Sequence, residues 1–312
     1  MFQEKKPLFL YCISPVHMGA GTALGAVDNP IQREIHTGHP TMAGSGLKGA
    51  FRDVFAEASG EWGRKATPET NRIFGPAGEG EQAADHAGAV SFADAQLVLF
   101  PVRSLRRSFV YATCPTALGR LQRLLAVAGI EDAAGWKVPE VRDDRCRTPA
   151  GSPAVAGGTL VLETYQFDAQ EDPGVGEIAT WLADNALPDA DGFGHFHEKL
   201  TSDLVVLSDE RFNHFVKHAT LVEPHVRIND ESGTADDRGL FYTENLPPES
   251  LLVTLVMASR ERVKKGESDR EGMTAREVMG KIHQALDGRL AQVGGDATTG
   301  RGQVMLRFAG GA

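Results

Sequence analysis

Apolar residues recur along the chain at two spacings, and the spacing changes from segment to segment. A short apolar run at 8–14 ends at Pro15 and predicts a strand. From 46 to 58, apolar side chains recur every three or four residues, which predicts a helix. The same patterns predict further strands at 89–94, 97–102, 160–167, 204–207 and 251–258, and further helices at 113–128, 175–187 and 209–218.

Other segments are marked by glycine, by turn residues or by a cap. The stretch 16–45 is rich in glycine and lacks periodicity, and a loop of that length is usually functional or disordered. Two arms, 222–229 and 239–244, flank a polar, turn-rich connection and predict a hairpin. Thr274 begins a helix, because Glu277 three residues later completes a capping box.

The order of these elements predicts an α+β fold. Strand–helix–strand order near both ends fits a split βαβ, ferredoxin-like core, with helices on one side of the sheet. We find no internal repeat at a period of 20–50 residues.

Composition narrows the class of protein. The 312 residues, 41% of them hydrophobic, suffice for one large domain with insertions or for two domains. No apolar run approaches the roughly 18 residues that span a bilayer, and the first residues lack a signal-peptide pattern. Cys12, Cys114 and Cys146 are too far apart for a metal pair or a disulfide framework, which predicts a reduced, cytoplasmic protein.

The net charge of −10 argues against a free-standing nucleic-acid binder. Basic residues nevertheless cluster locally. The clusters are Lys48 with Arg52, then Arg103, Arg106 and Arg107, then Lys264 with Lys265. A basic groove on an acidic body would leave the acidic remainder to face solvent or basic partner subunits.

Gly44 to Gly49 matches the pattern G-x-G-x-x-G. A dinucleotide site needs a strand directly before it, and a Walker A loop needs Ser or Thr after Lys48, so both are disfavoured. Two interpretations stay open: the helix N-terminus binds a phosphate and Lys48 and Arg52 extend the site, or the glycines give the helix clearance. The second cluster, Gly294 to Gly302, offers the same choice between an approaching phosphodiester and an ordinary bulged turn.

Several polar side chains are candidates for chemistry. Asp28, followed by Asn and Pro, is either a turn former or a carboxylate that holds Mg²⁺ or Mn²⁺ against a phosphate oxygen. His17 on the same loop is either solvated or a proton carrier. Asp94 and Glu244 each end a predicted strand, where they are second carboxylates or solvated strand ends.

Two aromatic or histidine pairs favour ordinary structural roles. His195 and His197 form an H-x-H pair, but zinc would need further ligands, such as Asp203 and His214, at no recognisable spacing. We interpret that pair as part of a loop before a strand. Phe241 and Tyr242 can stack on bases or pack into the sheet, and core packing is the default.

Longer segments carry a resemblance to a known family. They are His17–Gly21, Gly25–Glu34, His36–Pro40, Gly44–Asp53, Phe100–Ser104, Gly239–Pro248 and Thr299–Gly302. Together they closely resemble the repeated backbone subunit of type III-B (Cmr-type) CRISPR effector complexes, within the RAMP superfamily. The resemblance spans nearly the whole chain, and the last segment matches the superfamily's C-terminal glycine-rich loop.

The resemblance implies an architecture and an activity. One RAMP domain, 1–312, would have an RRM-like palm at 1–60, 86–128, 155–168, 201–221 and 250–312, insertions at 61–85 and 129–200, and a β-hairpin thumb at 222–249. Copies would stack into a filament along the CRISPR RNA, beside other subunits of the complex. Each thumb would interrupt the guide–target duplex, and each copy would cut target RNA with Mg²⁺ or Mn²⁺.

The resemblance also implies residue roles. Asp28 aligns with the acidic loop residue that cutting requires and would hold the metal, and His17 falls near the same site. The implied RNA contacts are Gly44, Ser45, Gly46, Lys48, Arg52, Arg103, Gly300, Arg301 and Gly302. The thumb would contribute Phe241, Tyr242 and Glu244, with Thr243 standing where an acidic residue is expected.

Three alternatives remain. The chain could be a guide-RNA filament subunit without chemistry of its own, or a metal-independent CRISPR-RNA processing ribonuclease that uses His17 as a base. A remote third is a nucleotide-binding enzyme with its site near Gly44–Gly49.

Overall fold

A computed structural model describes residues 2–21, 25–60, 68–76, 86–131, 135–262 and 271–310. The helices are α1 (Gly44–Ala58), α2 (Pro68–Phe74), α3 (Pro115–Val127), α4 (Pro173–Ala186), α5 (Gly194–Asp203), α6 (Asp209–His218) and α7 (Ala275–Leu286), with a 3₁₀ turn η2 (Ala297–Thr299). The strands are β1 (Glu4–Cys12), β2 (Thr41–Met42), β3 (Val90–Phe92), β4 (Ala95–Ser104), β5 (Ser108–Thr113), β6 (Arg145–Thr148), β7 (Thr159–Leu162), β8 (Tyr165–Glu171), β9 (Leu204–Val206), β10 (Leu221–Ile228), β11 (Ala235–Asn245), β12 (Leu251–Ala258), β13 (Leu290–Gln292) and β14 (Gln303–Phe308). The mixed α+β class is thus confirmed.

Local signals set several helix ends. The Thr274 hydroxyl accepts from the N–H of Glu277, and the Glu277 carboxylate accepts from the N–H of Thr274, so the predicted capping box of α7 is present. Ser208 caps α6 in the same way through the N–H of Arg211.

Most strands join one twelve-stranded sheet, and its central part has a regular order. The neighbours β14, β1, β12 and β4 are antiparallel throughout. Helix α1 follows β1, and α7 connects β12 to β13 and β14. This order is the one expected for two interleaved strand–helix–strand units.

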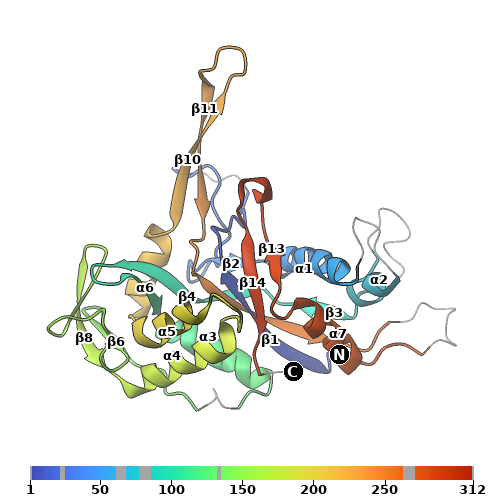
Figure 1. Ribbon diagram of the computed structural model, residues 1–312, viewed down its shortest axis with the longest axis horizontal. Coiled ribbons are helices and arrows are strands. Elements are labelled where there is room, and N and C mark those ends of the chain that lie inside the picture. Colours follow the sequence, from blue (N-terminus) through green and yellow to red (C-terminus); the bar gives the residue numbers. More distant parts are fainter. Residues whose placement is uncertain are drawn as a thin grey trace.

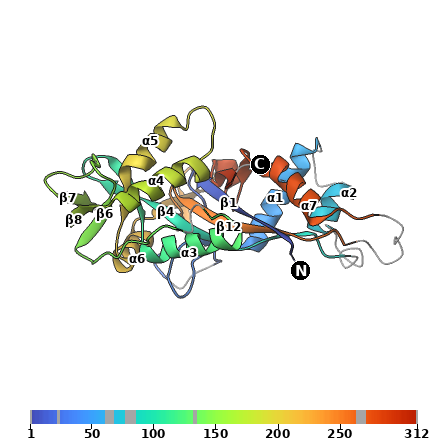
Figure 2. The same ribbon diagram turned by 90° about the horizontal axis from the view of Figure 1, so that it is seen from below.

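Helices cover both faces of the sheet, so the expectation of helices on one side is wrong. Leu8 and Leu10 of β1 belong to the core cluster that contains α1 and α7, whereas Phe9 and Tyr11 belong to the cluster that contains α3 and α4. Because alternate residues of a strand point to opposite faces, an all-apolar strand needs cover on both. Figures 1 and 2 both show α1, α2 and α7 at one end of the molecule and α4, α5 and α6 at the other.

The segment 129–200 contributes β6, β7 and β8 to the main sheet and folds α4 and α5 against it. The predicted helix at 175–187 is α4, whereas the single strand predicted at 160–167 is two antiparallel strands, β7 and β8. Helix α5 was missed, and His195 and His197 therefore lie on a helix and not on a loop. Helix α5 buries few side chains, so its sequence carries little apolar periodicity.

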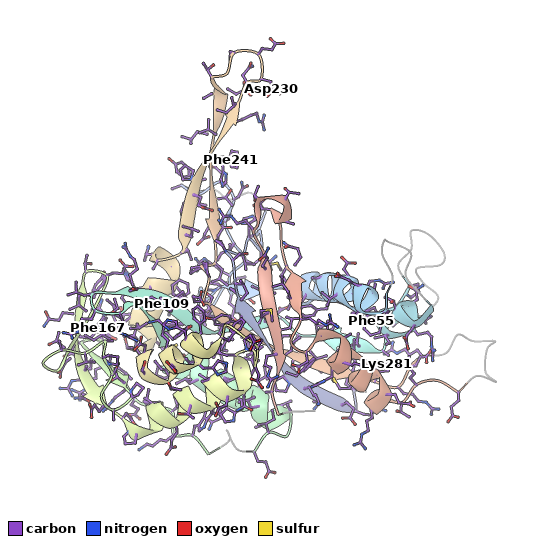
Figure 3. All side chains as sticks on the ribbon, in the orientation of Figure 1. Phe55, Phe109, Phe167, Asp230, Phe241 and Lys281 are labelled. Carbon is purple, nitrogen blue, oxygen red and sulfur yellow. The ribbon has the colours of Figure 1, made fainter. Side chains whose placement is uncertain are left out.

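Strands β10 and β11 form a separate two-stranded sheet that projects far from the body (Figure 1). Large apolar side chains are exposed along it, among them Val222, Val226, Ile228, Leu240 and Tyr242. The default expectation that Phe241 and Tyr242 pack into the core is therefore wrong (Figure 3 labels Phe241 on the projecting part).

None of the helices in the described ranges is long and apolar enough to cross a membrane.

Candidate nucleic-acid interface

The N-terminal loop pairs with the outer edge of β11 at the base of the hairpin. Asn29 donates its N–H to the Tyr242 carbonyl (3.0 Å), and Glu244 donates its N–H to the Asn29 carbonyl (2.9 Å). The other backbone group of each of these two β11 residues is hydrogen-bonded to a side chain of the loop. Tyr242 N–H donates to Asp28 Oδ2 (2.7 Å), and the Glu244 carbonyl accepts from His17 Nδ1 (2.7 Å).

Because their side chains are both hydrogen-bonded to the backbone of β11, Asp28 and His17 lie against the same edge of one strand. Their anchors, Tyr242 and Glu244, are two residues apart, a separation of about 7 Å along a strand. Asp28 is exposed, and its Oδ1 accepts no hydrogen bond from any described residue. Because a carbonyl oxygen only accepts, His17 Nδ1 carries a proton, so Nε2 of the neutral ring keeps its lone pair.

Glu244 is buried beneath this edge and is not a solvated strand end. Its side chain is 8% exposed. Arg33 Nη2 donates to Oε1 (2.5 Å), Thr220 Oγ1 donates to the same oxygen (2.8 Å), and the N–H of Ile31 donates to Oε2 (3.1 Å). The carboxylate thus ties the N-terminal loop to both strands of the hairpin base.

Arg33 extends that network into helix α6. Its Nη1 donates to the Val216 carbonyl (2.8 Å) and to the Gly38 carbonyl (2.9 Å). Val216 lies in the last turn of α6, where carbonyls lack helical partners. Arg33 and Thr220 were not identified as part of the site, because nothing in the local sequence marks their partners.

The second glycine cluster packs against the same N-terminal loop. A Cβ at Gly294 would lie 2.3 Å from the His17 carbonyl oxygen, and one at Gly302 would lie 2.3 Å from the Val293 carbonyl oxygen. These two glycines therefore admit protein backbone. Gly300 has open space around it and a φ of 80°, as a turn requires. Arg301 pairs with Glu223 of β10 at 2.7 Å, so this loop also holds the hairpin base.

The N-terminus of α1 already has a carboxylate partner. Asp94 Oδ1 accepts from the N–H of Gly44 at 2.7 Å. A Cβ at Gly44 would lie 2.3 Å from the Phe92 carbonyl oxygen, so Gly44 provides clearance. The phosphate interpretation fails at Gly44, and Asp94 acts as a cap, whereas Ser45 and Gly46 remain exposed.

Lys48 and Arg52 differ in whether the protein already supplies a hydrogen-bond partner for the side chain. Arg52 donates to the Gly75 carbonyl (2.6 Å) and to Asn71 Oδ1 (2.6 Å), which holds the end of α2. Lys48 is half-buried and makes no ion pair or hydrogen bond with the described residues. Burial and the neighbouring Arg52 charge lower the pKa of Lys48. Of the two, Lys48 is the one available to a ligand.

The other basic candidates are distributed differently. Arg103 is largely exposed and pairs with Glu163 on β7–β8. Arg107 pairs with Asp203, which is fully buried and also bonded to Lys199. Lys264 and Lys265 lie outside the described residues.

The aromatic and histidine candidates are separate from one another. Phe241 stacks on His225 across the hairpin, with ring centroids 5.2 Å apart. His197 Nε2 lies 3.0 Å from the Pro188 carbonyl oxygen. Asp203 serves an ion pair, so it is no zinc ligand partner for these histidines.

A metal at this site would depend on Asp28. Across the described part of the chain, no group of three or more His, Cys, Asp or Glu side chains is arranged to hold a metal ion. Asp28 fits Mg²⁺ or Mn²⁺ as a single hard oxygen donor, because these ions take further ligands from phosphate oxygens and water.

Comparison with known proteins identifies the class that this fold and site define. The model of the RAMP superfamily matches residues 9–305, nearly the whole chain. The chain therefore belongs to the RAMP superfamily.

The relatives point to one branch of that superfamily. The chain is 34% identical over 299 residues to the CRISPR system Cmr endoribonuclease Cmr4 of Pyrococcus furiosus, covering 95% of this chain and 93% of that protein. It is 23% identical over 322 residues to the CRISPR system CMR subunit Cmr4 of Saccharolobus solfataricus, covering 97% and 96%.

Solved structures share the fold. Oligomeric Cmr4 from Pyrococcus furiosus matches with a TM-score of 0.72 at 24% identity, over 99% of both chains. A chain of the type III-B Cmr-beta complex bound to cognate target RNA matches with a TM-score of 0.69 at 17% identity, over 98% of both chains. The suspected resemblance to Cmr-type RAMP proteins is confirmed.

Proposed function

We propose that this protein is a repeated, RNA-binding backbone subunit of a type III-B CRISPR complex and that each copy cuts target RNA. The 34% identity to a Cmr endoribonuclease over almost the full length supports this activity. The central sheet would be the RRM-like palm, and the β10–β11 hairpin would be the thumb. Partners would be CRISPR RNA, target RNA, further copies and other subunits of the complex.

One observation carries the proposal: Asp28 and His17 are both anchored on the outer edge of β11. In the proposed reaction the ribose 2′-hydroxyl attacks the adjacent phosphate and displaces the 5′-oxygen. His17 Nε2 accepts the hydroxyl proton, since Nδ1 is held as a donor by the Glu244 carbonyl. Asp28 orients the reacting groups through its free oxygen, and its other oxygen keeps it fixed on the strand.

A divalent ion bound to Asp28 would supply positive charge beside the phosphate. Residues of the thumb would set the geometry of the reacting groups. Val222, Val226, Leu240 and Tyr242 are exposed on the thumb. They share one face, because Val226 pairs with Leu240 across the strands and the other two lie an even number of residues along their own strands. Such a face would insert between base pairs, splay a nucleotide and set the in-line geometry.

Guide-RNA binding would use the exposed backbone and the free cation at the start of α1. Ser45 and Gly46 are exposed, and Lys48 is uncommitted among the described residues. Arg103, Gly300 and Arg301 would also contact the RNA. Arg103 would then leave Glu163 or bind it and the phosphate together, and Arg301 would do the same with Glu223.

The test is cleavage of target RNA by the assembled complex carrying Asp28→Asn. Asparagine keeps an oxygen that accepts from Tyr242 N–H and removes only the charge, so the loop should stay in place. We expect cleavage to fall by about 10²–10⁴-fold, with guide and target binding unchanged. Unchanged cleavage would mean that the subunit is a filament protein without this chemistry.

The arrangement of His17 favours one second candidate, a metal-independent ribonuclease that uses Nε2 as base. EDTA separates the two. Loss of target cleavage with EDTA, restored by Mg²⁺ or Mn²⁺, supports the metal-dependent reaction. Cleavage that survives EDTA but is lost in His17→Ala supports the second candidate.

A further inference from the structure

A large pocket lies beside the base of the hairpin, next to the candidate site. Its volume is about 650 Å³, within the roughly 300–1,000 Å³ typical of ligand pockets. Thr220, which donates to Glu244, forms part of its lining, together with Leu221 at the start of β10. The pocket therefore abuts the network that positions the N-terminal loop.

The walls of the pocket are aromatic. Phe109, Tyr165 and Phe215 line it, and Tyr165 meets Phe215 edge to face with centroids 5.7 Å apart. His214 and His218 of α6 add two imidazole rings whose centroids are 4.7 Å apart. Figure 3 labels Phe109 in the body of the molecule, below and to one side of the projecting hairpin. Flat rings on several walls suit a flat, aromatic ligand.

A constrained carboxylate also lines the pocket. Glu249 has a φ of 68°, a left-handed conformation that is costly for a residue with a side chain. Its N–H donates to the Cys12 carbonyl at 2.8 Å, and its Oε2 accepts from the buried Tyr11 hydroxyl, which is bonded in turn to Tyr111. Oε1 accepts no hydrogen bond from the described residues. Backbone strain of this kind is concentrated at functional sites.

Apart from the carboxyl group of Glu249, whose pKa is raised by burial, the acidic and basic side chains of the lining are paired. Arg103 at the rim is paired with Glu163, so it adds no net charge. Burial, then the neighbouring His218 and Arg211, lower the pKa of His214, which favours the neutral form of that ring. The lining therefore offers a ligand several aromatic rings and one carboxyl oxygen of Glu249 that can accept from an N–H.

We propose that this pocket binds one unstacked nucleobase of the RNA, between the Tyr165 wall and the free oxygen of Glu249. The proposal rests on the proposed function, since a thumb that splays a nucleotide leaves a base without its neighbours. Each nucleobase carries an N–H donor on its pairing edge, so one carboxylate oxygen can accept from any of them. Binding through stacking and one shared donor is independent of sequence, as a subunit that serves any guide requires.

The test uses the assembled complex with Asp28→Asn, so that the RNA stays intact. Guide and target strands carry 4-thiouridine at one position at a time and are irradiated, and the crosslinked peptides are mapped by mass spectrometry. We expect one nucleotide in each structural repeat to crosslink to Tyr165 or to α6. Tyr165→Leu keeps the apolar wall but removes the ring, and it should lower that yield about tenfold.

His218→Ala provides a second, surface variant on the same wall, and Lys217→Ala is its control, since Lys217 is exposed on α6 but does not line the pocket. We expect His218→Ala to lower the yield and Lys217→Ala to leave it unchanged. Crosslinks confined to other segments, or a yield that neither pocket variant alters, would overturn the proposal. Cleavage is scored separately, so failure of Asp28 as the catalytic residue leaves the crosslinking result independent.

Discussion

Two arginine–glutamate pairs in this protein differ mainly in burial. Arg33 and Glu244 meet at 2.5 Å, with side chains 22% and 8% exposed, and both make further hydrogen bonds. Arg103 and Glu163 meet at the surface, where the arginine side chain is 82% exposed. A buried pair that loses one partner leaves an uncompensated charge, whereas a surface pair exchanges its partner for water.

We predict that Arg33→Ala destabilises the protein by about 3–5 kcal/mol. The matched surface change, Arg103→Ala, should cost less than about 1 kcal/mol. Urea unfolding followed by circular dichroism gives both values. Equal effects of the two changes would show that the Arg33–Glu244 pair does not hold the loop on β11.

The hairpin divides into an anchored base and an exposed outer part. At the base, the N-terminal loop takes the outer backbone groups of Tyr242 and Glu244, and Arg301 holds Glu223. Beyond Val226 and Leu240, the hairpin projects away from the body (Figure 1), and the side chain of Ile228 faces solvent. An isolated hairpin is marginally stable in water, so the outer part contributes little to folding.

Replacing 227–239 with Asn-Gly, which closes a tight turn between the paired Val226 and Leu240, should change stability by less than about 1 kcal/mol. Target-RNA cleavage by the assembled complex should be lost, because the hairpin loses its projecting outer half, including the exposed Ile228, and is too short to cross the duplex, while Asp28 and His17 stay anchored. Asp230→Ala at the exposed tip serves as the control and should cleave normally. Normal cleavage by the shortened protein would exclude a role for the outer hairpin.

The main sheet is buried on both faces, and the reactivity of the three buried cysteines measures how often that core opens. Cys12, Cys114 and Cys146 are free and fully buried, on or beside strands of the main sheet. Burial raises the pKa of all three thiols, that of Cys146 to about 12. A thiol reagent can reach them only when the helix layers separate from the sheet.

We predict that the native protein reacts with a disulfide reagent at least about a thousandfold more slowly than the denatured protein. Ala126→Cys, on the exposed side of α3, is the control and should add one rapidly reacting thiol. Rapid reaction of a native cysteine would indicate local opening of the sheet short of global unfolding.

Local patterns accounted for much of the architecture. Helix α6 and strand β12 begin and end at the predicted residues. The hairpin was also predicted, although β11 begins at Ala235, four residues before the predicted second arm. These features depend on residues within one or two turns of each other. The apolar part of β1, residues 7–12, is buried at every position and so contained the signal for cover on both faces, although the helices were expected on one.

The residues available for chemistry were decided by contacts between distant segments. Gly44 and Asp94 lie 50 positions apart, and Arg33 and Glu244 lie 211 apart, yet each pair is hydrogen-bonded. Three candidate carboxylates therefore separate into a helix cap at Asp94, a buried hydrogen-bonded group at Glu244 and an exposed group with one unbonded oxygen at Asp28. Glu249, which the sequence did not single out, lies in the pocket with a left-handed backbone conformation. Burial and hydrogen bonding set the chemistry of a carboxylate, and both depend on partners that the fold alone brings together.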